Sequence, residues 1–328
     1  MSSTVPQEFL LGVNYPWVNY GQDFGRNPWG TGANGVSSPN TRASVSDDFD
    51  RIRACGVTLV RWFLLCDGRS GLTTTNGIPT GPDDLLFSDV AAALELAQQF
   101  GLRLCFSLLD FLWMQNRGQD AAGLPNQDIL KFPAGRDALL QTVLIPLFTQ
   151  FRGHPALYAW EIANEPEWAI SDFVGSPKAQ MKLDDFFAFA REICDAIREY
   201  SQAQVTLGSA RLRWVPSWSD LALDFYQAHF YPSTEGGQHA DLAALLENLN
   251  PQQYLDQPLW LGELPAQTPA TPSFTLGAAL DTCKAAGLSG AGVWRWRPPE
   301  AGGGDQGYGS ADPQFLRDWL TRNDILGA

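Results

Sequence analysis

Residues 157–166 read LYAWEIANEP, an almost continuously apolar run that ends in two polar residues and a proline. Such runs are typical of a strand in a parallel sheet, because both faces of the strand are buried. Residues 259–263 read LWLGE and repeat the pattern, again with a carboxylate at the end. The two segments therefore predict buried strands that lead into Glu165 and Glu263.

Six further β-rich apolar runs alternate along the chain with segments of helical spacing. Eight strands that alternate with helices predict parallel βα units, and we expect a single-domain α/β fold, a (β/α)8 TIM barrel over residues 1–328. A doubly wound open sheet is the alternative. It would usually carry a glycine-rich phosphate loop after an early strand, and we find none. The eight runs are residues 9–15, 57–65, 103–109, 157–163, 204–209, 223–230, 259–262 and 290–296.

Capping residues and helix breakers predict where the helices begin and end. Ser46 predicts the start of one helix, and Ser88 predicts the start of another over residues 89–100. Pro146 is expected to kink or split a helix near residues 135–151. The other expected helices cover residues 183–200 and 240–249, run from Ser273 or Thr275 to Gly287, and cover residues 313–321.

The charge of the chain restricts its partners. The formal net charge is −14, and a surface of this sign repels nucleic acid and anionic lipid. No apolar stretch is long enough to span a bilayer. We therefore expect neither nucleic acid nor a membrane as a partner, and the charge suits a neutral substrate.

The five cysteines are scattered, with neither a paired nor a metal-ligand spacing. They predict buried free thiols, which favours a reducing compartment such as the cytoplasm. No signal peptide is recognisable before residue 9, and secretion after removal of such a segment stays open. The sequence also has no metal-ligand cluster and no serine nucleophile elbow, so we expect no cofactor and no metal.

The two strand-end carboxylates carry the chemistry. Barrel enzymes place their catalytic groups at the C-terminal ends of the strands, where Glu165 and Glu263 are expected. Two carboxylates that face each other are the minimum requirement for cleaving a glycosidic bond. One protonates the leaving oxygen, and the other attacks or activates water.

The tripeptide Asn164-Glu165-Pro166, with Glu263 at the seventh strand, resembles the retaining β-glycosidases on α/β barrels, a clan that includes cellulases, β-mannanases and other enzymes of glycoside hydrolase family 5. Further matches lie at three other strand ends: Arg61 at the second, His229 and Tyr231 at the sixth, and Trp294 at the eighth. The resemblance covers essentially the whole chain.

The resemblance implies a role for each matching residue. Glu165 would be the general acid/base, and Glu263 would be the nucleophile, kept ionised by Arg61 and by a hydrogen bond from Tyr231. The remaining residues would serve the sugar: Asn164 would bind its 2-hydroxyl, His229 would orient the acid/base or a hydroxyl, and Trp294 would form the floor of the site.

The chain departs from the clan at the third strand, which ends in Asp110 where many members have histidine or asparagine. Asp110 could bind sugar hydroxyls itself. Trp17, Asn19 and Tyr20, in the aromatic loop of residues 14–25, are candidates for sugar subsites, and packing within the loop is an equal alternative. Three other carboxylates are expected to be structural: Glu161 as a buried group paired with a basic residue, and Glu167 and Glu235 as solvated loop charges.

The sequence thus predicts a retaining hydrolase of β-linked glycosides, of the β-mannan or β-glucan type. Two alternatives stay open, namely an exo-acting β-glycosidase on small oligosaccharides and a glycan-binding barrel without activity. A barrel isomerase or aldolase normally needs a lysine or a metal cluster at a strand end, and no lysine lies at a predicted one.

Overall fold

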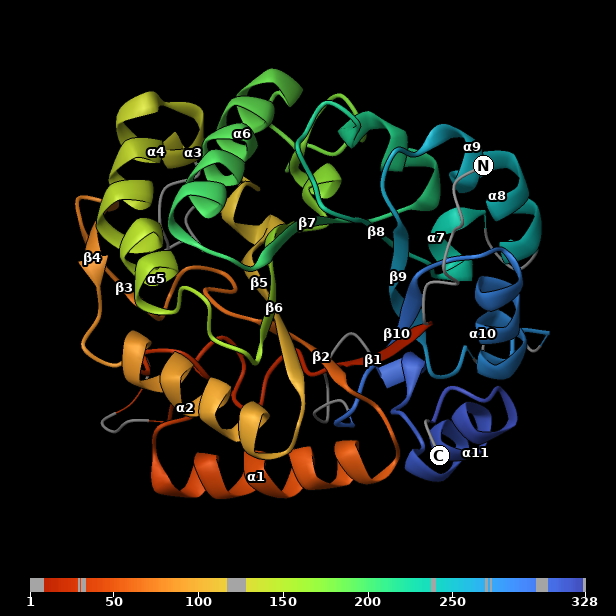
Figure 1. Ribbon diagram of the computed structural model, residues 1–328. Helices are drawn as coiled ribbons and strands as arrows, with labels where there is room; N and C mark the ends of the chain where they lie inside the picture. The colour runs from red at the N-terminus through yellow and green to blue at the C-terminus, as the bar shows by residue number, and fades with distance from the viewer. Residues whose placement is uncertain are drawn as a thin grey trace.

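A computed structural model describes residues 9–28, 30, 34–116, 128–236, 240–268, 271, 273–298 and 306–326. Eight parallel strands close into a barrel in the order β1-β10-β9-β8-β7-β6-β5-β2, with helices arranged around the outside (Figure 1). The predicted single-domain barrel is confirmed. The strands are β1 (Leu10–Asn14), β2 (Leu59–Phe63), β5 (Arg103–Asp110), β6 (Leu157–Asn164), β7 (Gln204–Ser209), β8 (Tyr226–His229), β9 (Leu259–Pro265) and β10 (Gly290–Trp294).

One hairpin outside the barrel was not predicted. It consists of β3 (Leu72–Thr75) and β4 (Ile78–Pro82), which pair antiparallel. The turn between them is Asn76-Gly77, with φ of 53° and 77°. Asn-Gly between two short β-rich runs is a strong hairpin signal, so the sequence does contain the information.

The helices lie between the strands, and short 3-10 turns follow several strand ends. The α-helices are α1 (Pro39–Ala54), α2 (Leu86–Gln99), α3 (Asp128–Lys131), α4 (Pro133–Leu139), α5 (Ile145–Gln150), α6 (Leu183–Tyr200), α7 (Pro232–Glu235), α8 (Leu242–Leu249), α9 (Pro251–Tyr254), α10 (Leu276–Ala285) and α11 (Pro313–Arg322). The 3-10 helices are η1 (Phe111–Trp113), η4 (Pro166–Ala169), η5 (Leu212–Trp218) and η7 (Gln306–Tyr308), and Leu140–Leu144 form a π-helical segment.

The predicted starts of the first two helices are wrong. Helix α1 begins at Pro39, because proline fits the first turn, where its missing N–H is not needed, and Ser46 lies inside the helix. Helix α2 begins at Leu86, and the carboxylate of Asp83 accepts hydrogen bonds from the free N–H groups of Leu85 and Leu86. Ser88 is therefore not the capping residue.

The predicted break at Pro146 is confirmed. The π-helical segment separates α4 from α5, and Pro146 lies in the first turn of α5. Proline cannot donate a backbone hydrogen bond, and the chain adopts the wider turn just before it. Thr275 is the cap of α10, since its hydroxyl accepts from Ala278 N, which decides between the two predicted starts of that helix.

Apolar side chains from the strands and the surrounding helices form the core, which includes the buried indoles of Trp62 and Trp160. All five cysteines are buried free thiols, as predicted. Within the described ranges, no helix is both long and apolar enough to cross a membrane.

Candidate active site

The C-terminal ends of the strands surround a cavity of about 310 Å³. Seven of the nine residues proposed from the sequence line it: Trp17, Asp110, Asn164, Glu165, Tyr231, Glu263 and Trp294. The other two, Arg61 and His229, are fully buried and contact the lining carboxylates. The fold thus collects all nine residues in one place.

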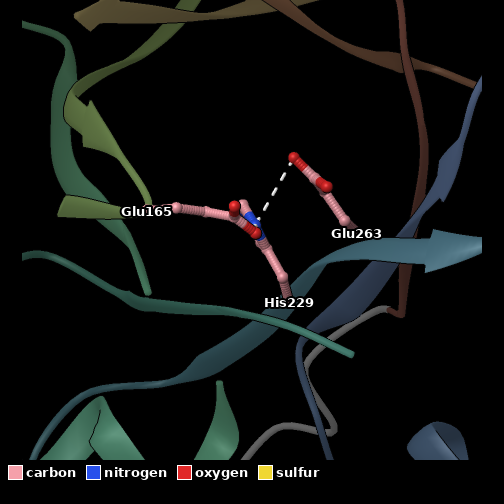
Figure 2. A group of neighbouring side chains, drawn as sticks. All are labelled: Glu165, His229 and Glu263. Atoms are coloured by element: carbon pink, nitrogen blue, oxygen red, sulfur yellow. Dashed lines mark hydrogen bonds and ion pairs between the residues drawn. The ribbon is translucent and has the colours of Figure 1, made fainter. Parts of the chain in front are cut away.

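Glu165 and Glu263 come from opposite sides of the cavity and point toward each other, with His229 between them (Figure 2). Nδ1 of His229 lies 2.8 Å from Oε1 of Glu165 and 3.4 Å from Oε1 of Glu263. One oxygen of each carboxylate lies within 4.8 Å of the other. Retaining glycosidases hold their two carboxyl groups about 5–5.5 Å apart, so the arrangement suits that mechanism. The same three side chains could also hold a metal ion.

Two donors hold the carboxylate of Glu263. Nη1 of Arg61 donates to Oε1 at 2.6 Å, and the hydroxyl of Tyr231 donates to Oε2 at 2.7 Å. Burial raises the pKa of Glu263, while His229, Arg61 and Tyr231 act in the opposite direction. The expected partners are therefore in place, although they do not outweigh the effect of burial.

Glu165 has a different environment. It follows β6 in a left-handed backbone conformation, with φ of 49° and ψ of 45°, and its N–H donates to Gly208 O at 2.7 Å. Oε2 accepts a hydrogen bond from Nε1 of Trp168 at 2.8 Å. Trp168 both lines the cavity and contacts this carboxylate.

A buried ion pair lies beneath the site. Nε and Nη2 of Arg61 donate to the two carboxylate oxygens of Glu161, each at 2.6 Å, as predicted for a buried, paired Glu161. Burial alone would raise the pKa of Glu161, but Arg61 outweighs it and the pKa falls. Both charges are retained, and Arg61 remains a permanent cation below Glu263.

Asn164 connects this pair to Asp110. Its Oδ1 accepts from Nη2 of Arg61 at 2.7 Å, and its Nδ2 donates to Oδ2 of Asp110 at 2.8 Å. Burial raises the pKa of Asp110 to about 7, although the hydrogen bonds from Leu112 N and Asn164 lower it. Asp110 therefore fixes the orientation of the Asn164 amide at the cavity wall.

His229 is neutral near pH 7. Burial lowers its pKa to about 4, Glu263 raises it, and Arg61 lowers it further. A neutral imidazole can form the hydrogen bond to Glu165 without adding charge to the site.

Aromatic rings form much of the remaining wall. Trp17 packs edge-on against Tyr20 with ring centroids 4.7 Å apart, and against Phe63 at 5.9 Å. Tyr231 packs against Tyr308 at 4.7 Å. Phe63 and Tyr308 were not predicted. Phe63 ends β2, so its position at a strand end was visible in the sequence, whereas nothing marked Tyr308.

Two expectations at the periphery need revision, and one open alternative is decided. Glu167 is not a solvated charge: it is fully buried, and burial raises its pKa to about 7. Glu235 is half-buried and accepts a hydrogen bond from Leu212 N. Asn19 donates to the carbonyl of Asn34 and does not line the cavity.

Comparisons with known proteins identify relatives of the chain. No protein-family model matches the chain. The mannan endo-1,4-β-mannosidase of Mytilus edulis is 33% identical over 163 residues, which are 49% of this chain and 41% of that protein. The mannan endo-1,4-β-mannosidase of Cryptopygus antarcticus is 24% identical, with 78% of this chain and 72% of that protein covered. The match thus spans about two fifths of the mussel relative.

The fold is also found among solved structures. The β-mannanase of the blue mussel Mytilus edulis superimposes with a TM-score of 0.74 over 97% of this chain and 93% of that chain, at 20% identity. This likeness shows the shared barrel. With the two sequence relatives, it confirms the resemblance of the chain to the family 5-like β-glycoside hydrolases.

Proposed function

We propose that the chain is a retaining β-glycoside hydrolase that cleaves β-1,4-linked mannan, with Glu165 as general acid/base and Glu263 as nucleophile. The observation that carries the proposal is the pair of facing carboxylates in unlike surroundings. Arg61 and Tyr231 donate to Glu263, whereas Glu165 contacts the indole of Trp168 and His229. The names of the sequence relatives support mannan as the substrate.

In the first step, Glu263 attacks the anomeric carbon while the bond from that carbon to the leaving oxygen breaks. The proton of Glu165 passes to the leaving oxygen, so no alkoxide has to depart. A covalent glycosyl ester on Glu263 remains. Arg61, paired with Glu161 on its other side, keeps a positive charge beside Glu263 throughout.

In the second step, Glu165 acts as the base. It takes a proton from a water molecule, whose oxygen attacks the anomeric carbon and breaks the ester to Glu263. The sugar leaves with its β configuration retained. His229, hydrogen-bonded to Glu165 and neutral near pH 7, holds the carboxylate in line in both steps.

The remaining lining residues would bind the sugar. Asn164 and Asp110 present amide and carboxyl groups to its hydroxyls, and Trp294 and Trp17 present aromatic rings that suit its C–H faces.

The five buried thiols support the cytoplasm as the compartment. Fractionation of the source cells, with the protein detected by antibody, would test that location.

The test is hydrolysis of a panel of β-linked oligosaccharides, with the product anomers followed by NMR. Glu263→Ala should lose nearly all turnover on the best substrate, and azide should partly restore it by forming a glycosyl azide. Unchanged turnover of Glu263→Ala would exclude Glu263 as the nucleophile. Release of single sugars alone would indicate exo action. Faster hydrolysis of glucans than of mannans would exclude mannan as the main substrate. Binding without cleavage would indicate a glycan-binding barrel.

A further inference from the structure

The end of strand β7 holds the end of strand β6 from outside the cavity. The carbonyl of Gly208 accepts a hydrogen bond from Glu165 N at 2.7 Å. One residue beyond Pro166, the buried carboxyl of Glu167 accepts from Ser209 Oγ at 2.5 Å and from Ala210 N at 3.0 Å. These contacts fix the backbone of η4, the turn that carries Trp168.

Arg211 follows β7 and stacks on the indole of Trp168, which η4 carries. Its guanidinium carbon lies 4.9 Å from the ring centroid of Trp168 and 4.6 Å from that of Trp214. The two indoles are 5.5 Å apart and nearly perpendicular, at 80°. Nε of Arg211 has no hydrogen-bond partner in the part of the chain that the structure describes. Stacking on the two rings therefore helps to place this group, together with the attraction of the carboxylates of Glu235, Glu165 and Glu167.

The orientation of Trp168 matters because Nε1 of its indole donates to Oε2 of Glu165 at 2.8 Å. A tilt of the ring would move this donor away from the carboxylate. We propose that Arg211 is a positioning residue for Glu165, which it reaches by fixing the indole of Trp168. The inference rests on the proposed function, since it assigns Arg211 to the acid/base of that reaction.

The surroundings of Glu165 give the direction of the expected effect. Loss of Arg211 removes a nearby positive charge and loosens the indole donor, and both changes disfavour the ionised form of Glu165. The basic limb of the profile of kcat/KM against pH should therefore move to higher pH. The titratable and charged groups that face Glu165 or Arg211 are His229 on β8, Glu263 on β9, Asp110 on β5, Glu167, Glu235 on α7 and Arg213.

The experiment compares Arg211→Met with Arg213→Met. Arg213 is an exposed arginine two residues further on, with its guanidinium carbon 5.2 Å from the Trp214 ring, so the control removes the same charge from the same segment. Each variant is assayed on a β-1,4-manno-oligosaccharide and on a 2,4-dinitrophenyl β-mannoside. The second substrate needs little protonation of its leaving group.

For Arg211→Met we expect kcat/KM on the oligosaccharide to fall about tenfold, the aryl substrate to change less than about twofold, and the basic limb to move up by about 0.5 pH unit. Arg213→Met should match the wild type in all three. Equal behaviour of the two variants, or equal losses on both substrates, would overturn the role of Arg211. A wild-type chain that cleaves no β-linked substrate would instead refute the proposed function.

Discussion

At the scale of single residues, the surroundings of Glu263 set the acidic side of the activity profile. Burial raises the pKa of Glu263, and the donors Arg61 and Tyr231 limit the rise. Only the ionised carboxylate can attack the anomeric carbon, so the activity should fall as the pH drops through this raised pKa. Each donor to the ionised form therefore extends the active range toward lower pH.

Tyr231→Phe tests this account. The substitution removes the 2.7 Å hydrogen bond to Oε2 of Glu263 and keeps the ring that packs on Tyr308. Since the ionised form loses a donor, the pKa of Glu263 should rise further, and the acidic limb of kcat/KM should move up by about 0.5–1 pH unit. Tyr308→Phe removes a hydroxyl from the same aromatic pair and should leave that limb in place. An unmoved limb in Tyr231→Phe would show that the hydrogen bond does not control the ionisation.

At the scale of elements, β7 depends on a glycine at a crowded position in the barrel interior. A Cβ on Gly208 would lie 2.7 Å from Oε1 of Glu161 and 2.8 Å from Nε2 of Gln227. Glu161 cannot easily move away, because Arg61 and Ser107 hold the same carboxylate. The absence of a side chain thus lets β7 pack beside the buried ion pair.

Gly208→Ala should therefore destabilise the fold by about 1–3 kcal/mol, the usual range for an overpacked core. Gly175→Ala is the matched control, since a Cβ there meets no atom within 4 Å, and it should change the free energy of unfolding by less than about 0.5 kcal/mol. Urea titration followed by circular dichroism measures both values. Equal stability of the two variants would mean that the interior around Glu161 has room for a methyl group.

The elements also show what the sequence could and could not predict. The buried strands were recognisable because both faces are apolar, and the polar residues at several strand ends could be identified from the sequence. The predicted starts of α1 and α2 were wrong. Helix α1 begins at Pro39, before Ser46, and the carboxylate of Asp83, rather than Ser88, caps α2. Local capping patterns can compete, and only the three-dimensional contacts decide between them.

Partners within the site were harder to predict than its members. The nine site residues lie at strand ends or in a loop beside them. Because the barrel brings all its strand ends to one face, the strand positions alone predict that these residues are neighbours. Which donor meets which carboxylate depends on the relative placement of different strands. Glu167 was predicted to be a solvated loop charge, yet the end of β7 covers it through Ser209 and Ala210.

At the scale of the whole molecule, several buried groups make the stability depend on pH. Burial raises the pKa of Glu167 and Asp110 to about 7 and that of Asp23 to about 6. The folded state therefore binds protons that the unfolded state has released, so the stabilisation is complete below the ordinary carboxyl pKa and is lost as the pH rises toward 7. His229, with a pKa lowered to about 4, acts in the opposite direction between pH 4 and its ordinary value of 6.5.

Above about pH 6.5 the effect of the carboxyl groups dominates, so the free energy of unfolding should fall between pH 6.5 and 8. Glu167→Gln isolates one contribution, because the amide oxygen can take the place of Oε1 and accept from the Trp218 indole and Ser209 Oγ. Its NH2 group replaces Oε2 and loses the hydrogen bond from Ala210 N, which lowers the stability by the same amount at every pH and leaves the slope with pH as the test. A folded pKa of about 7 implies that the wild type loses about 1 kcal/mol relative to this variant between pH 6 and 8. Glu247→Gln, at an exposed position on α8, should instead run parallel to the wild type. Urea titrations of the three proteins across this range measure the slopes, and a Glu167→Gln curve parallel to the wild type would show that Glu167 is already ionised in the folded chain.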